Sequence, residues 1–278
     1  MSPKDDPGCY FVASGFAAVL NFPLWKASAI AQSGFSVPGN AGVIAKYIEV
    51  MKPPYKGMIA VIGGMTWARG AIFYGSDSCK DMMVYHGFSN TTSTLFPPLI
   101  ISTIVQIINQ PIVRASITIQ DPVSKYRNTL EAMRGIAQTK GLSGLWHGTS
   151  AGILKTVPKY CTAIAIKDTV ETLLPKTDYP THSEELARSA IKSITAGVAG
   201  AALTNPLDVL RNEMFKTDQG LLDTLRSLYK NEGSAFMSRG MSKNLIAVAI
   251  PIAVTIFTTD ALVNAKRDNH LKASEQAV

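Results

Sequence analysis

Apolar residues gather into long segments of this 278-residue chain, separated by loops rich in glycine, proline and charge. Residues 93–113 carry no charged side chain, and the same holds for residues 10–25 and 244–259. The first of these segments is long enough to cross a bilayer as a helix, and the other two need flanking polar residues to reach the interfaces. The pattern therefore predicts an all-α membrane protein.

The periodicity and its breaks predict six long helices and three short amphipathic ones. The long helices are expected at residues 10–33, 58–84, 94–120, 149–174, 187–216 and 241–266. The short helices, which would lie along the membrane surface, are expected at residues 41–50, 126–140 and 220–231. Pro23, Pro111 and Pro206 fall inside the first, third and fifth long helices, where a missing N–H kinks the helix.

Each of these prolines opens one copy of a repeated motif. The clearest copy runs from Pro206 through Asp208 to Arg211, and weaker copies begin at Pro23 and Pro111. Glycines follow at a near-constant distance (Gly57, Gly148 and Gly240), and aspartates follow the glycines at a constant distance (Asp77, Asp168 and Asp260). The period of about 90 residues indicates a threefold repeat. We expect one domain over residues 1–278, with repeats at 10–86, 94–175 and 187–267.

Composition narrows the class of protein. The apolar content of 46% is modest for a membrane protein, but the inward faces of a polar-lined bundle need not be apolar. The net charge of +7 would suit a nucleic-acid binder, yet no basic run with interleaved aromatic residues supports such a partner. No nucleophile–base pair, metal-ligand spacing or phosphate loop is present, so neither an enzyme nor a cofactor is expected.

Loop charge predicts an orientation. The first long loop carries Lys46, Lys52 and Lys56 against Glu49, whereas the short connector at 172–187 has more acidic than basic residues. By the positive-inside bias, the long loops face the more negative compartment and both termini face the other side.

Together these motifs resemble the mitochondrial carrier family, over about residues 10–266. A second element of that family, a glycine followed by an aromatic residue and a further glycine, is matched from Gly141 to Gly148 and from Gly233 to Gly240. The resemblance implies a multi-pass protein of the inner mitochondrial membrane, with both termini toward the intermembrane space. It also implies six spanning helices around a central cavity, in three pseudo-symmetric repeats with short surface helices on the matrix side.

The gate that closes the matrix side of such carriers is degenerate here. The resemblance implies ion pairs between neighbouring helices, but only Asp208 and Arg211 of the charged positions remain. The other gate positions hold Trp25, Val113, Ser28 and Ser116. We expect Asp208 and Arg211 to pair with each other at i,i+3, and closure to rest on apolar packing and the serine hydroxyls. Lys26 and Arg114 lie on another helix face and are not expected to replace the missing pairs.

The gate on the intermembrane side departs from the family as well. Asp77 and Lys80 keep the expected pattern, but Glu171 follows Asp168 where a basic residue is expected. Val263 stands at the basic position that follows Asp260. Four carboxylates thus oppose one ammonium, and closing such a ring in a low dielectric is costly.

The resemblance also assigns substrate contacts and lipid sites. Substrate-contact positions fall on Gly64, Lys155, Thr156 and Ala247. Lys155 is expected either to bind a small anionic solute or to pair with Asp168 or Asp208. Cardiolipin phosphates are expected at the even-helix N-termini, where backbone N–H groups are free. The residues there are Lys56, Gly57, Gly148, Arg239 and Gly240.

Two functions compete at this stage. The degenerate gates favour a transport-impaired accessory subunit of a larger membrane complex, with other subunits as partners. The alternative is an active carrier that exchanges small anionic metabolites. An outer-membrane relative that acts in protein insertion or organelle shape is a third, weaker possibility.

Overall fold

The structure, a computed structural model, describes residues 7–35, 48–49, 52–174 and 181–276, and these are helical apart from turns and connectors. The helices are α1 (Pro7–Ser33), α3 (Met58–Tyr85), α4 (Asn90–Thr118), α5 (Thr129–Lys140), η1 (Leu142–Trp146), α6 (Thr149–Leu154), α7 (Thr156–Leu173), α8 (His182–Thr217), α9 (Leu221–Glu232), η2 (Gly233–Ser238) and α10 (Met241–Gln276). The all-α fold expected from the sequence is confirmed.

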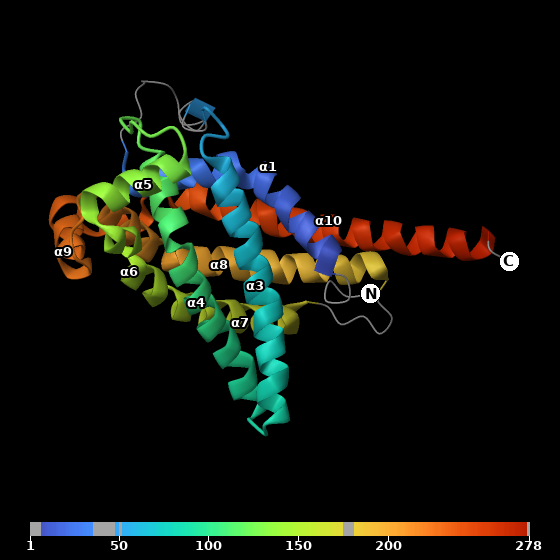
Figure 1. Cartoon of the computed structure of the whole chain (residues 1–278). Coiled ribbons are helices and arrows are strands. Elements are labelled where there is room, and N and C mark those ends of the chain that lie inside the picture. Colours follow the sequence, from blue (N-terminus) through green and yellow to red (C-terminus); the bar gives the residue numbers. More distant parts are fainter. Residues whose placement is uncertain (1–6, 36–47, 50–51, 175–180, 277–278) are drawn as a thin grey trace.

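The long helices pack side by side in a bundle. α10 packs between α1 and α8, α7 packs along α8, and α3 pairs with α4 as a hairpin. Figure 1 shows this hairpin running away from α8 and α10 toward its tip, while α5, α6 and α9 gather at the other side of the molecule. We call the end of the bundle that holds α5 and α9 the basal end, and the opposite end the mouth.

The helices divide into apolar and polar sets. α1, α4 and the segment Met241–Lys266 of α10 are long and apolar enough to cross a membrane. α3, α7 and α8 are more polar because they carry the charged side chains of the cavity described below, among them Arg69, Lys159 and Asp208. A bundle with a polar interior needs no uniformly apolar helices, which accounts for the mean hydropathy of only +0.13.

A glycine in the left-handed conformation stands before the second, fourth and sixth spanning helices, which begin with α3, α6 and α10. Gly57, Gly148 and Gly240 precede α3, α6 and α10 with φ of 75°, 81° and 69°. An L side chain at such a φ is strained, which explains why glycine recurs at these three positions. The repeated glycines therefore mark the turn at which each even helix begins.

The sequence analysis expected a continuous fourth spanning helix at residues 149–174. The structure instead divides it into α6 and α7 at Lys155. Pro158 has no N–H to donate to the carbonyl of Leu154, so the helical ladder is interrupted there. The hydrogen bonds from Lys155 N to Ala151 O (3.3 Å) and from Lys159 N to Lys155 O (3.1 Å) continue the helix on either side.

Other helix bounds follow local capping. α8 begins five residues before its expected start because Thr181 and Glu184 form a capping box. α5 begins only at Thr129, since the Asn128 side chain accepts from the Glu131 N–H at 2.9 Å. The surface helix expected at 41–50 lies almost wholly outside the described residues.

Apolar packing of the basal end holds the two described surface helices. Ala132 and Ile136 of α5 pack with Ala115 and Ile119 of α4. In the third repeat the equivalent cluster joins α8 to α9 and η2, and its buried members are Val209, Leu210, Leu228 and Phe236. Each surface helix is thereby fixed to the long helix that precedes it in the chain, α5 to α4 and α9 to α8. This packing positions the residues that close the basal end.

Candidate functional site

A cavity of about 600 Å³ lies at the centre of the bundle and reaches from Tyr10 near the mouth to Asn212 near the basal end. Its wall comes from α1, α3, α4, α7, α8 and α10. Among the described residues that line it, the charged ones are Arg69, Lys155, Lys159, Asp208 and Arg211. Positive charge therefore dominates the interior.

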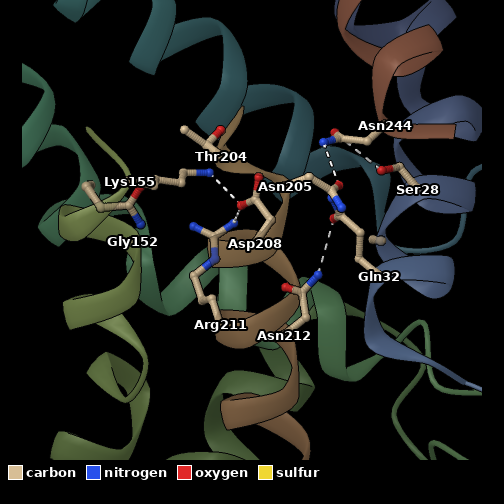
Figure 2. A network of polar contacts seen from close by, with 12 residues as sticks. Ser28, Gln32, Gly152, Lys155, Thr204, Asn205, Asp208, Arg211, Asn212 and Asn244 are labelled. Carbon is tan, nitrogen blue, oxygen red and sulfur yellow. Dashed lines mark hydrogen bonds and ion pairs between the residues drawn. The ribbon is translucent and has the colours of Figure 1, made fainter. Parts of the chain in front are cut away.

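One carboxylate in this cavity holds two of the cations. Lys155 Nζ donates to Asp208 Oδ1 at 2.6 Å, and Arg211 Nη2 donates to the same oxygen at 3.1 Å. Figure 2 shows both basic side chains converging on Asp208, from the α6–α7 junction and from α8. The Asp208–Arg211 pairing expected from the sequence is confirmed. For Lys155, the sequence analysis left open anion binding or pairing with Asp168 or Asp208. The structure shows the ion pair with Asp208.

The expected substrate-contact positions are only partly gathered at the cavity wall. Gly64, Lys155 and Ala247 line it. Thr156 is buried, and its hydroxyl donates to the Gly152 carbonyl of the preceding turn at 3.3 Å. The assignment of these positions as substrate contacts stays a prediction, and the geometry favours it least for Thr156.

The basal end of the cavity is closed by a network of neutral amides, which we call the amide brace (Figure 2). Gln32 Nε2 donates to Asn205 Oδ1 at 2.9 Å, and Asn244 Nδ2 donates to the same oxygen at 3.1 Å. Asn212 Nδ2 reaches Gln32 Oε1 at 3.4 Å, and the Ser28 hydroxyl donates to Asn244 at 3.5 Å. The brace joins α1, α8 and α10, three helices from the two ends of the sequence.

Apolar packing completes the basal closure. Trp25 and Val113, which replace acidic gate residues, pack against a buried cluster of Ala29, Ile117 and Phe215. The Ser116 hydroxyl does not reach across the cavity but lies 3.5 Å from the Thr129 hydroxyl at the start of α5. Of these two serines, Ser28 donates a hydrogen bond from α1 to Asn244 of α10 at the basal end, and among the described residues Ser116 makes no such contact between spanning helices.

A second set of charges locks the basal end from outside the cavity, which the sequence analysis did not expect. The guanidinium of Arg114, buried in α4, donates to the Asp218 carboxylate and to the Gly144 carbonyl, and Lys140 donates to the other oxygen of Asp218. We call Arg114, Asp218 and Lys140 the basal latch. Burial and the Arg114 charge lower the pKa of neighbouring His147, so this histidine stays neutral near pH 7. Arg114 thus points away from the cavity, as its helix face predicted, and does not take a missing gate position, but its ion pair joins α4 to the end of α8.

At the mouth, one of the four carboxylates has a partner that the sequence analysis did not consider. His182 Nε2 lies 2.8 Å from Asp260 Oδ1, and Asn264 donates to Asp260 Oδ2 at 3.1 Å. Asp77 and Lys80 are half-buried on α3. The side chains of Asp168 and Glu171 lie outside the described residues.

The expected lipid positions are placed as follows. Gly57, Gly148 and Gly240 stand directly before α3, α6 and α10, and Lys56 lies beside the first of them. Arg239 is engaged within the protein, because its guanidinium donates to Glu213 at 2.8 Å, to Glu232 and to the Gln32 carbonyl. Its side chain is therefore already satisfied without a lipid phosphate.

Two cavity cations, Arg69 and Lys159, were missed from the sequence. Each lies about one helical turn beyond an expected contact position, Arg69 after Gly64 and Lys159 after Lys155. The available signal was the placement of a basic residue on an intramembrane helix, which by itself marks a candidate functional residue.

Comparison with known protein families supplies independent information. The family model described as "Mitochondrial carrier protein" matches residues 90–178 and 182–270. These segments overlap the second and third expected repeats, and the division of the chain into three repeats stays a prediction.

Individual relatives are similar at modest identity. "Mitochondrial brown fat uncoupling protein 1" of Bos taurus is 24% identical over 236 residues, covering 75% of this chain and 74% of that protein. "Solute carrier family 25 member 47-B" of Danio rerio is 27% identical over 50% of this chain and 49% of its own length. "Mitochondrial thiamine pyrophosphate carrier 1" of Neurospora crassa is 31% identical over 52% of this chain and 45% of its own length. The match to the latter two spans about half of each protein.

Proposed function

We propose that this chain, which belongs to the mitochondrial carrier family, carries a small anionic solute across the inner mitochondrial membrane. The family membership makes it a multi-pass membrane transporter. The anionic solute, the state of the gates and the direction of the termini are the further steps of the proposal.

The observation that carries the proposal is the charge of the cavity wall. Arg69, Lys155, Lys159 and Arg211 line it against the single described carboxylate of Asp208. Moving a cation from water into a low-dielectric interior costs several kcal/mol unless an opposite charge compensates it. Among the described residues, the cavity has more cationic side chains than carboxylates. An anion that enters the cavity compensates this excess positive charge, so the arrangement favours anion binding.

The Lys155–Asp208 ion pair suggests how binding loosens the bundle. It ties the junction of α6 and α7 to α8 at the depth of the expected substrate contacts. An anion that takes the Lys155 ammonium competes with Asp208 for it and weakens this tie. A ligand shifts a conformational equilibrium only through such a difference in affinity between two states. Pro158 leaves the Leu154 carbonyl without its helical N–H partner, so bending at the α6–α7 junction breaks no hydrogen bond there.

The accessory-subunit hypothesis depended on gates that could not form. At the basal end the amide brace and the basal latch supply closing contacts of another chemistry. At the mouth, the His182 ring and the Asn264 amide both contact the Asp260 carboxylate. The degenerate gate motifs therefore no longer favour a structural role over transport, and we propose the active carrier.

Orientation and lipid contacts complete the proposal. We place the basal end at the matrix and both termini in the intermembrane space, following the charge of the long loops. Cardiolipin phosphates are placed at the left-handed glycines Gly57, Gly148 and Gly240, whose following helices offer free N–H groups. Lys56 supports the first of these sites. Arg239 is left out, because Glu213 and Glu232 already occupy it.

Uptake by purified protein in cardiolipin-containing liposomes tests the proposal. The solutes are nucleotides, phosphate, dicarboxylates and tricarboxylates, each offered against itself and against the others. Saturable exchange of an anion is expected, with a large loss in Lys155→Gln. The matched control is Arg226→Gln, which removes an exposed charge from the surface helix α9. If none of these anions exchanges while the protein remains folded, the carrier proposal is wrong and the accessory role returns.

A further inference from the structure

The cations of the central cavity lie at two levels. Lys155 and Arg211 share the Asp208 carboxylate near the basal end, and we call these three residues the lower level. Arg69 and Lys159 lie nearer the mouth and form the upper level. Lys159 follows Lys155 by four residues on α7, a rise of about 6 Å along a helix. The two levels are thus separated by roughly one helical turn.

At the upper level Arg69 has an unfilled donor. Its Nη1 atom is buried and has no hydrogen-bond partner in the part of the chain that the structure describes. A buried charged donor without an acceptor is more costly than an unsatisfied neutral group. Native proteins rarely leave such a group unsatisfied, which points to an acceptor that arrives from outside the chain.

Lys159 presents a second cation to the same space. Its aliphatic stem runs over Gly200 of α8, where an added Cβ would lie 3.6 Å from Lys159 Cγ. The residue is exposed to the cavity, and no ion pair to it is seen among the described residues. The Asp208 carboxylate attracts the Lys159 charge from the lower level, and the positive charges of Arg69 and Arg211 oppose it. An oxyanion between them would satisfy the Arg69 donor and remove this repulsion.

We propose that Arg69 and Lys159 form a second anion-binding site above the Lys155–Asp208–Arg211 group, and that the ligand carries two anionic groups, one for each level. The inference rests on the proposed function for its meaning in transport, but not for binding itself. Both carboxylate and phosphate groups fit this chemistry. Arginine binds either through paired N–H donors, and lysine binds either as a point charge.

Binding to the purified protein, measured by calorimetry, tests the inference with two pairs of probes. Glutarate is compared with monomethyl glutarate, and pyrophosphate with methyl phosphate, so that each pair sets two anionic groups against one. For at least one pair, the wild-type protein is expected to bind the two-group member about ten-fold more tightly, which corresponds to about 1.4 kcal/mol. Arg69→Gln and Lys159→Gln should each bring this ratio close to one, whereas Arg226→Gln should leave it unchanged.

The melting temperature without ligand supplies a second readout. Because Arg69→Gln removes a buried charged donor that has no acceptor among the described residues, this variant should melt at or above the wild-type temperature, whereas loss of a structural contact would lower it. Arg69→Lys keeps the charge and should retain part of the preference. A preference that is absent in the wild type, or that survives in both variants, overturns the inference. Two-group binding without exchange in liposomes overturns the proposed transport and leaves the second site standing.

Discussion

Lys155 and Asp208 lie 53 residues apart in the chain, and their side chains meet at 2.6 Å in the wall of the cavity. The pair joins the junction of α6 and α7 to α8, the helix that carries the best-preserved repeat motif. Arg211 shares the same carboxylate oxygen, so Asp208 is the point at which two cations are neutralised together. Loss of the carboxylate and loss of one cation are therefore not equivalent changes.

Asp208→Asn should destabilise the protein more than Lys155→Gln. The first change leaves Lys155 and Arg211 without their shared carboxylate, and removing one partner from a buried pair costs about 3 kcal/mol. In Lys155→Gln, Arg211 still compensates Asp208. Thermal unfolding in detergent would measure both changes and the double variant. The double variant should cost less than the sum of the two single losses, because the residues are in contact. Strict additivity would show that the pair contributes nothing.

Asn205→Leu should open the amide brace. Asn205 accepts from Gln32 and Asn244, and its amide donates to the Met237 carbonyl at 2.8 Å and the Arg239 carbonyl at 3.1 Å. Leucine leaves these groups unsatisfied, which we expect to cost about 3 kcal/mol. The measurement is the loss of melting temperature, which should barely change with ionic strength since the lost contacts are neutral.

Asn231→Leu is the matched control for the brace. Its amide reaches only the Ser227 hydroxyl, at 3.4 Å on the exposed face of α9. A surface change of this kind should stay within about 0.5 kcal/mol of the wild type. If Asn205→Leu were equally mild, the brace would not hold the basal end closed.

Three variants of the basal latch should fall in a fixed order. Asp218→Asn should cost about 3 kcal/mol, because it leaves the buried Arg114 guanidinium without its carboxylate. Arg114→Gln should cost less, because the Asp218 side chain that remains is 38% exposed and keeps its contact with Lys140. Asparagine tolerates the left-handed backbone of Asp218, at φ 57°, so that variant reports on charge alone. Lys140→Gln should cost less than about 1 kcal/mol, since 39% of its side chain is exposed. Thermal unfolding gives the order, and a Lys140 variant as damaging as the Arg114 variant would contradict it.

The left-handed glycines should differ in how they tolerate alanine. At Gly240 an added Cβ would lie 2.8 Å from the backbone nitrogen of Gln32, so α10 must move away from α1. At Gly87, which also has positive φ, the Cβ meets nothing within 4 Å and only backbone strain of about 1 kcal/mol remains. Gly240→Ala should therefore lower the melting temperature far more than Gly87→Ala. Similar losses would mean that strain alone, without contact, explains both.

The sequence predicted most of the fold because its signals are local. Proline and glycine mark helix ends and kinks directly, so α3 and α9 begin and end within a residue of expectation. The break at Lys155 was missed, although Pro158 is visible in the sequence, because Pro23, Pro111 and Pro206 sit in helices that remain continuous.

The site was less accessible to sequence reasoning because its contacts are long-range. The partner of Arg114, Asp218, is 104 residues away and lies beyond the end of α8, where no motif marks it. The glutamine at position 32 stands out nine residues after Pro23, but nothing local identifies Asn205 and Asn244 as its network. The pair Asp208 and Arg211 was found correctly because it sits on one helix turn.

The amide brace has an electrical consequence. A membrane potential does work on charge, about 2.3 kcal/mol for each elementary charge moved through 100 mV. The side chains of Gln32, Asn205, Asn212 and Asn244 carry none, so parting them requires no such work and the potential neither pulls the brace open nor holds it shut. Any dependence of the transport cycle on voltage must then arise at charged groups, such as the basal latch, the cavity cations and the solute they bind.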